Sequence, residues 1–161
     1  MRKEIEVKFK IARFGPIIER LRRVGAQLEW RGREESFYYD TISQHLKETG
    51  RVLGFRREPN GQNVLTLKSI VPTKNHNHSG ILQNTRMVDE YAVETEHFKE
   101  THRLLRHMGY SAYSSQAHQK QHWSVGGVSV ELNTTGRKKY IEIKGVPKLV
   151  KQTALFLNIH R

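Results

Sequence analysis

The chain has 161 residues, of which 28 are Lys or Arg and 16 are Asp or Glu, so its formal net charge is +12. The absence of cysteine excludes disulfide bonds and thiolate metal sites, and no apolar run approaches the ~20 residues of a membrane-spanning helix. The length suits a single domain over residues 1–161. We expect this domain to be cytoplasmic and not to associate with a membrane. The positive charge favours a polyanionic partner, such as nucleic acid or a phosphate-rich small molecule.

Eight segments alternate apolar and polar residues with the period of two that is typical of β-strands. They cover residues 4–11, 36–40, 52–58, 63–70, 87–95, 117–124, 127–133 and 139–144. Helical periodicity predicts helices over 14–24, 97–108 and 148–157, and a short turn around Leu46. The turn-rich segment 72–80 is predicted to be a loop between two halves. This pattern indicates an α+β protein built on an antiparallel sheet or barrel.

The two faces of the predicted strands differ in chemistry, because neighbouring side chains on a strand point to opposite sides of the sheet. One face is apolar on strand after strand, so that the helices can cover it. It carries Ile5, Val7, Phe9, Leu53, Phe55, Leu65, Leu67, Val128, Val130, Leu132, Ile141 and Ile143.

The opposite face is charged. It carries Glu4, Glu6, Lys8, Lys10, Arg56, Thr66, Lys68, Glu90, Glu131, Asn133, Glu142 and Lys144. A charged face that simply meets water is the commonest arrangement in antiparallel sheets. If the sheet instead closes into a barrel, its first and last regular strands can bring Glu4, Glu6 and Glu142 within reach of a common Mg²⁺ or Mn²⁺ ion. The Lys and Arg side chains would then face phosphate oxygens, an arrangement suited to phosphoryl transfer.

The segment "EIEVK" at residues 4–8 resembles the ExExK signature of the CYTH superfamily. These triphosphate tunnel proteins include class IV adenylate cyclases, thiamine triphosphatases and inorganic triphosphatases. Further segments follow in the order of the family's landmarks: "FYYDT" resembles its YFDT segment, "VLGFRRE" its LRIR strand, "VLTLK" its LTxK strand, Arg86 and Glu90 its R-x-E strand, "LLRHMGY" its LxxLGF helix end, and "VSVELN" and "YIEIKG" its LD and F-x-E-I-E-G strands. The resemblance covers nearly the whole chain.

The resemblance implies an eight-stranded antiparallel barrel, open at both ends, with helices outside and a lumen that binds a triphosphate with Mg²⁺ or Mn²⁺. It implies metal ligands at Glu4, Glu6 and Glu142, and a role for Lys8 in orienting or activating the nucleophile. The expected substrate-binding residues are Lys10, Arg56, Lys68, Arg86, Lys120 and Lys144, with Glu90 and Asn133 as further candidate site residues.

Three positions depart from the family pattern. Asn133 stands where the family usually has Asp, Lys144 where it has the second Glu of EIE, and Gly54 where it has the first Arg of LRIR. A divalent ion would be held less firmly in such a lumen. Two hypotheses follow: either one metal site survives and Lys144 contacts phosphate directly, or catalysis is lost and the barrel binds an anionic ligand.

Three functions are compatible with the sequence. The first is a metal-dependent enzyme acting on ATP, thiamine triphosphate or inorganic triphosphate, by hydrolysis or by cyclising ATP to cyclic AMP with release of pyrophosphate. The second is a catalytically reduced module that binds nucleotide or RNA 5′-triphosphate. The third is a nucleic-acid-binding barrel whose Lys and Arg side chains cluster on its outer surface. The oligomeric state stays open.

Histidine and tryptophan residues supply weaker signals. His76 and His78 are expected in a solvated loop rather than a metal site, and His118 and His122 are expected at the surface in preference to a general-acid role. Trp30 and Trp123 are expected to pack in the core or at the rim rather than stack on a base.

Overall fold

The computed structural model describes residues 2–71 and 85–159, with side chains for 5–70 and 88–159. The described residues form eight strands and four helices. In chain order they are β1 (Arg2–Ile11), α1 (Gly15–Arg23), β2 (Gln27–Asp40), α2 (His45–Glu48), β3 (Arg51–Arg57), β4 (Asn63–Val71), β5 (Thr85–Thr95), α3 (Phe98–His107), β6 (Ser111–Val125), β7 (Val128–Thr135), β8 (Lys138–Gly145) and α4 (Pro147–Phe156).

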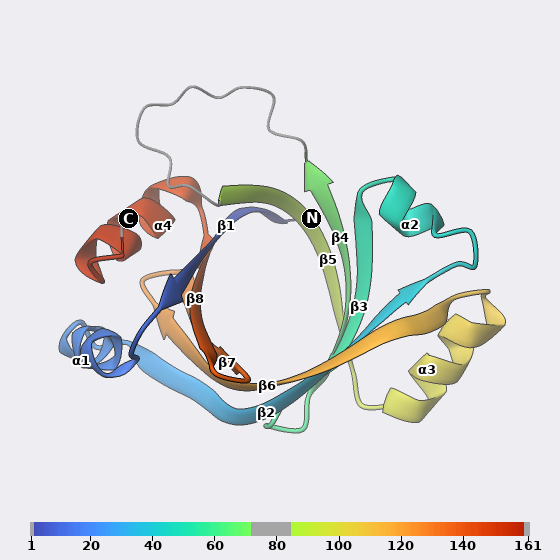
Figure 1. Cartoon of the computed structure of the whole chain (residues 1–161), viewed down its shortest axis with the longest axis horizontal. Helices are drawn as coiled ribbons and strands as arrows, with labels where there is room; N and C mark the ends of the chain where they lie inside the picture. Colours follow the sequence, from blue (N-terminus) through green and yellow to red (C-terminus); the bar gives the residue numbers. More distant parts are fainter. Residues whose placement is uncertain (1, 72–84, 160–161) are drawn as a thin grey trace.

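The eight strands form a closed barrel in the order β1-β5-β4-β3-β2-β6-β7-β8, and every neighbouring pair is antiparallel. The barrel closes where β1 pairs with β8, with Val7 opposite Ile143 and Lys8 opposite Glu142. Figure 1 shows the ring of strands with the helices outside it. The predicted fold class, an α+β protein with an eight-stranded antiparallel barrel and flanking helices, is confirmed.

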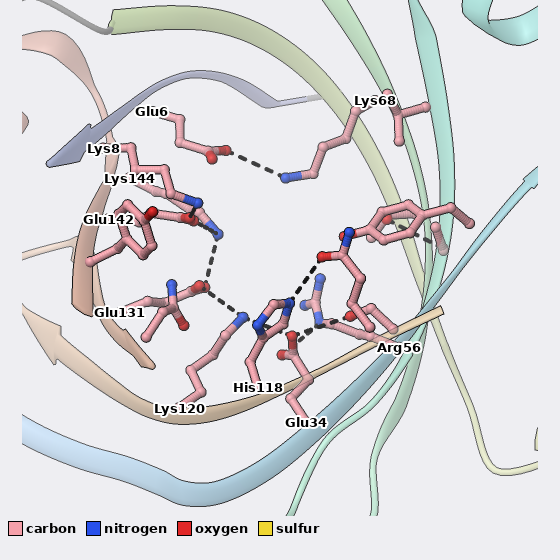
Figure 2. Close-up of a pocket in the computed structure, with 18 of the residues that line it drawn as sticks. Glu6, Lys8, Glu34, Arg56, Lys68, His118, Lys120, Glu131, Glu142 and Lys144 are labelled. Atoms are coloured by element: carbon pink, nitrogen blue, oxygen red, sulfur yellow. Dashed lines mark hydrogen bonds and ion pairs between the residues drawn. The ribbon is translucent and has the colours of Figure 1, made fainter. Parts of the chain in front are cut away.

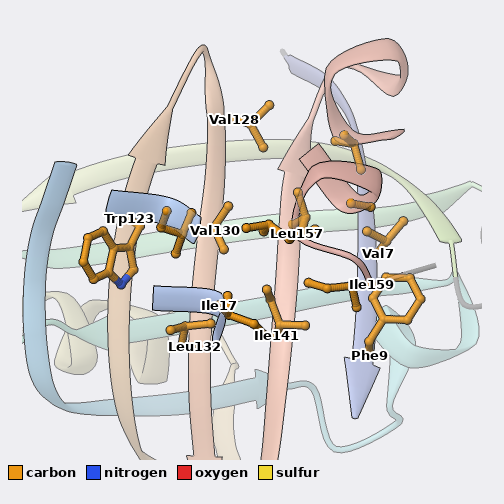
Figure 3. Close-up of a cluster of buried hydrophobic side chains, with 14 residues drawn as sticks. Val7, Phe9, Ile17, Trp123, Val128, Val130, Leu132, Ile141, Leu157 and Ile159 are labelled. Atoms are coloured by element: carbon orange, nitrogen blue, oxygen red, sulfur yellow. The ribbon is translucent and has the colours of Figure 1, made fainter. Parts of the chain in front are cut away.

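The larger hydrophobic core lies outside the barrel wall, between β1, β6, β7 and β8 and the helices α1 and α4 (Figures 1 and 3). Val7, Val130 and Ile143 from the strands are fully buried there against Leu21 of α1 and Val150 of α4. The apolar faces of these strands therefore point outward to the helices, and their charged faces are left to point into the barrel.

A second, smaller core packs α2 and α3 against the other side of the barrel. Phe55 of β3 stacks on Phe98 of α3, with ring centroids 4.7 Å apart. The buried Asp40 carboxylate accepts hydrogen bonds from the backbone N–H groups of Thr41, Leu46 and Lys47 at 2.7, 3.0 and 3.0 Å. Burial raises the pKa of Asp40, but these three N–H groups outweigh it and lower the pKa below its ordinary value.

The main difference from the predicted elements is the length of β2 and β6. β2 begins at Gln27 and β6 at Ser111, whereas alternation predicted strands only from 36 and 117. Their early halves are largely exposed on both faces, so no apolar alternation marks them. Gly32 in this part of β2 has φ +147°, and a Cβ there would lie 2.8 Å from Cβ of Pro59.

No described helix has the length and apolar character needed to span a membrane.

Candidate functional site

The barrel encloses a cavity of about 310 Å³ lined by charged side chains from most of its strands. This volume lies at the lower end of the range for small-molecule sites, roughly 300–1,000 Å³. Figure 2 shows basic and acidic side chains pointing toward one another inside the barrel. Among the described side chains, the charged lining residues are Lys8, Arg56, Lys68, Lys120 and Lys144 together with Glu6, Glu34, Glu131 and Glu142, a net charge of +1.

The pairing of β1, β8 and β7 brings four charged groups together on one wall. Lys8 Nζ donates to Oε1 of Glu142 at 2.6 Å. Lys144 Nζ donates to Oε1 of Glu131 at 2.9 Å and lies 3.6 Å from Oε2 of Glu142. Glu131 and Glu142 stand opposite each other in register, so one ammonium group reaches both carboxylates.

These contacts set the ionisation of the two carboxyl groups. Burial raises the pKa of Glu131, but the ammonium groups of Lys144 and Lys120 outweigh it and hold the pKa well below its ordinary value. The pKa of Glu142 is lowered in the same way, with burial opposed by Lys144 and Lys8. Burial lowers the pKa of Lys144, but Glu131, Glu142 and Glu6 together raise it above its ordinary value. All three groups are therefore charged at neutral pH.

The network continues along β6, β2 and β3. Lys120 Nζ lies 3.1 Å from Oε2 of Glu131, without the angle of a hydrogen bond, and donates to Oε1 of Glu34 at 2.8 Å. Arg56 Nε donates to Oε1 of Glu58 at 2.9 Å and lies 4.0 Å from Oε2 of Glu34. Bases and acids thus alternate across this wall, so each charge has a partner of opposite sign.

A separate cluster lies on β1, β4 and β5. Lys68 Nζ lies 3.5 Å from Oε2 of Glu6 and 3.3 Å from Oε2 of Glu90. The side chains of all three residues are about one quarter exposed, so the cluster is open to solvent and to an entering ligand.

Uncharged polar groups fill the gaps between the ion pairs. The ring of His118 contacts the hydroxyl of Thr135 through Nδ1 at 2.8 Å and Oε1 of Gln116 through Nε2 at 3.1 Å. Burial and the nearby Lys120 lower the pKa of His118, so the imidazole is neutral at pH 7. Oδ1 of Asn133 is buried in the lining and has no hydrogen-bond partner in the described part of the chain. It is an acceptor available to a ligand or a water molecule.

Two of the three predicted metal ligands, Glu6 and Glu142, have described side chains, and both lie beside lysine ammonium groups. Among the described side chains, no group of three His, Asp or Glu residues is arranged to hold a metal ion. Glu6 faces Lys68, and Glu142 faces Lys8 and Lys144, so the two described members of the predicted ligand set are paired with ammonium groups. The side chain of Glu4, the third member, lies outside the described residues. The described carboxylates therefore do not fit a resident divalent ion.

A family model of the CYTH domain matches residues 2–145, which is most of the chain. This chain belongs to the CYTH domain family. The CYTH domain is similar to solved structures across nearly its whole length. A candidate adenylate cyclase from Vibrio parahaemolyticus matches with a TM-score of 0.80 and 15% identity, over 99% of this chain and 88% of that one.

Two further structures share the fold. A Pyrococcus horikoshii protein matches with a TM-score of 0.73 and 20% identity, over 97% of this chain and 90% of that one. A candidate adenylyl cyclase from Hippeastrum, described by a dominant triphosphatase activity, matches with a TM-score of 0.61 and 14% identity, over 97% and 88% of the two chains. A comparison with curated proteins finds no match. At these identities the similarity establishes the fold.

The CYTH lumen contains most of the side chains that the sequence singled out. Those in the lining are Glu6, Lys8, Arg56, Lys68, Lys120, Asn133, Glu142 and Lys144, and Glu90 contacts the lining residue Lys68. Lys10 is exposed and is not part of the described lining. The side chain of Arg86 lies outside the described residues, as do His76 and His78, although the backbone of Arg86 pairs with Glu6.

Sequence reasoning assigned no site role to Glu34 and Glu131, which link the bases of the lumen wall. Glu131 stood on the predicted charged face, whereas Glu34 precedes the segment in which alternation was visible. The expectation that His118 lies at the surface was wrong, because the side chain of His118 on β6 lines the lumen. Trp123 is buried in the larger core, as expected.

Proposed function

We propose that this CYTH domain is a triphosphatase that binds the phosphate chain of its substrate in the barrel lumen. The observation that carries the proposal is the convergence of five basic side chains, from β1, β3, β4, β6 and β8, on one cavity. They are Lys8, Arg56, Lys68, Lys120 and Lys144. Phosphoryl transfer asks a protein mainly for positioning and for neutralisation of charge, and such a set of cations supplies both.

The pair of Lys8 and Glu142 suits the reacting end of the phosphate chain. The side chain of Lys8 is about half exposed, so its ammonium group can contact an entering terminal phosphoryl group while it stays beside Glu142. In the proposed reaction the oxygen of a water molecule attacks the terminal phosphorus, and the bond to the bridging oxygen breaks. Glu142 accepts the proton of the water, and the shortened phosphate chain leaves.

We favour hydrolysis over cyclisation as the reaction, because the Hippeastrum protein of the same fold is described by a dominant triphosphatase activity. ATP, thiamine triphosphate and inorganic triphosphate are the candidate substrates. We propose that the protein acts on them in the cytoplasm. No step depends on a resident metal ion, and the predicted requirement for Mg²⁺ or Mn²⁺ is part of what the assay below tests.

A second candidate function is a binding module for nucleotide or RNA 5′-triphosphate. The pairing of the lumen carboxylates with bases favours it, because the network is balanced and complete without any catalytic metal. Such a module would bind the same phosphate chain without cleaving it.

A turnover assay with the three triphosphates separates these functions. Phosphate, pyrophosphate and cyclic AMP are measured separately, each with Mg²⁺, Mn²⁺ or a chelator. We expect phosphate release, reduced roughly 10- to 100-fold in kcat/KM by Lys68→Gln, since that change removes a charged contact to phosphate. The matched control Lys151→Gln alters an exposed lysine of α4, outside the barrel, and should leave turnover unchanged. Cyclic AMP as the main product would make the protein a cyclase, and tight binding without any product would make it a binding module.

A further inference from the structure

Lys144 occupies an unusual position for a lysine, at the meeting point of lumen carboxylates. It points into the barrel from β8, two residues after Glu142 on the same face of the strand. Its Nζ atom lies 2.9 Å from Oε1 of Glu131 and 3.6 Å from Oε2 of Glu142, and its side chain is 18% exposed. Figure 2 shows the ammonium group between these two acids.

The oxygens of these two carboxylates all face nitrogen atoms. Lys144 faces one oxygen of each, and Lys8 takes the other oxygen of Glu142 at 2.6 Å. Lys120 lies 3.1 Å from the other oxygen of Glu131, which accepts no hydrogen bond but is paired with this charge. A divalent ion needs several free oxygen ligands, so it could bind here only by displacing an ammonium group. The nearby Asn133 offers one unpartnered oxygen but adds no negative charge.

We propose that Lys144 is a tethered cation that takes the place of a resident divalent metal in this lumen. Its ammonium group neutralises the carboxylates that would otherwise hold the ion. Because it is covalently attached, it fills the position at any metal concentration. If the protein is the triphosphatase proposed above, its triphosphate is then held by ammonium and guanidinium groups without a protein-bound metal.

The test measures Mn²⁺ binding to the protein alone, without any triphosphate, from the loss of the electron paramagnetic resonance signal of free Mn²⁺. We expect the wild-type protein to show no site tighter than about 1 mM, in the range of weakly charged oxygen sites. We expect Lys144→Glu to bind one Mn²⁺ ion at least about tenfold more tightly, because it replaces a cation by a third carboxylate beside Glu131 and Glu142.

Two further variants locate the new site. Glu142→Gln in the Lys144→Glu background should return the affinity to the wild-type value, because it removes a ligand of the new site. Lys8→Gln removes a different ammonium group from Glu142 but leaves Lys144 in place, and should bind Mn²⁺ as the wild type does. Lys144→Gln, which adds no third carboxylate to the lumen, should show a smaller gain in the same direction if Lys144→Glu does not fold.

A wild-type protein that binds one Mn²⁺ ion as tightly as Lys144→Glu, with the binding lost in Glu142→Gln, would overturn the proposal. So would a folded Lys144→Glu or Lys144→Gln variant with no gain in affinity. These outcomes are independent of turnover: a protein that cleaves no triphosphate but gains Mn²⁺ affinity in Lys144→Glu would refute the proposed function and leave this inference standing.

Discussion

At the scale of single residues, Glu131 forms ion pairs with two lysines of the lumen, although no sequence motif indicated such a role. The residue is 8% exposed, and its carboxylate lies within 3.1 Å of the ammonium groups of both Lys120 and Lys144. A buried acid that joins two bases is costly to remove, because both bases lose a partner of opposite charge. The lumen network is therefore part of the stability of the barrel as well as of its chemistry.

We expect Glu131→Gln to lower the free energy of unfolding by about 3 kcal/mol at pH 7. The folded pKa of Glu131 lies below its unfolded value of about 4.3, so its contribution is present above that pH and is lost as the pH falls toward the folded pKa. Urea unfolding at pH 7 and pH 3 should show a smaller difference between variant and wild type at pH 3.

Glu35 supplies the control for this prediction. It lies on β2, its side chain is 36% exposed, and it contacts Arg33 and Arg57 at 3.3 and 4.0 Å. Glu35→Gln should change the free energy of unfolding by less than about 0.5 kcal/mol at either pH. Equal effects of the two substitutions at pH 7 would contradict the special role of Glu131.

At the scale of elements, the four described helices pack on the outside of the barrel, and none of their residues belongs to the described lining of the lumen. α4 lies against β1, β7 and β8, and it buries Val150 and Ala154, with Leu157 directly after its end. Leu157 is fully buried, whereas Leu155, two residues earlier, is 53% exposed. This contrast allows the contribution of the helix to be measured without changing the lumen.

We expect Leu157→Ala to lower the free energy of unfolding by about 3 kcal/mol, because it leaves a cavity in the larger core. Leu155→Ala should change it by less than about 0.5 kcal/mol. Chemical denaturation measures both. The affinity of either folded variant for a triphosphate should equal that of the wild type, and a large loss of affinity in Leu157→Ala would show that α4 shapes the lumen.

The sequence predicted the existence and order of the elements well, because strands that bury one face alternate clearly. β8 and β1 are examples. In β8, Ile141 and Ile143 alternate with Glu142 and Lys144 of the lumen lining, and in β1, Val7 and Phe9 flank Lys8 of the same lining. The start of β2 could not be predicted in this way, because both of its faces are largely exposed and neither requires apolar residues.

The site was predicted in part for a related reason. A strand pattern shows which side chains share a face, but the partner of each charge depends on the register between strands that are distant in the sequence. Lys8 and Glu142 meet because β1 pairs with β8, and Lys144 reaches Glu131 because β8 pairs with β7. The acids were therefore predicted to gather around a metal ion, whereas the register places the described ones, Glu6 and Glu142, beside lysine side chains.

At the scale of the whole molecule, most of the excess positive charge of the described side chains lies outside the lumen. The described lining carries a net charge of +1, whereas residues 5–70 and 88–159 together contain 23 Lys or Arg and 15 Asp or Glu, a net charge of +8. An exterior of this kind attracts polyanions without specificity, and such attraction is screened by salt. The predicted nucleic-acid-binding function therefore concerns a different surface from the triphosphate site.

We expect labelled duplex DNA to bind the protein weakly at about 50 mM salt and to be largely released at about 200 mM, as for other contacts made mainly with phosphate. Fluorescence anisotropy measures this binding. Lys68→Gln should leave it unchanged, because Lys68 lies inside the barrel. DNA binding that survives high salt and is lost in Lys68→Gln would instead place the nucleic acid at the lumen.

The closure of the barrel by β1 and β8 also sets when the molecule can first act during its synthesis. Of the eight described strands β1 is made first, but one of its two neighbours is β8, which is made last of the eight. Pairing between such distant segments is slow, because the long loop between them must close before the contacts form. A nascent chain that lacks β8 also lacks Glu142 and Lys144 and leaves the barrel open between β1 and β7. The ability to bind a triphosphate would therefore report that translation of the barrel is complete.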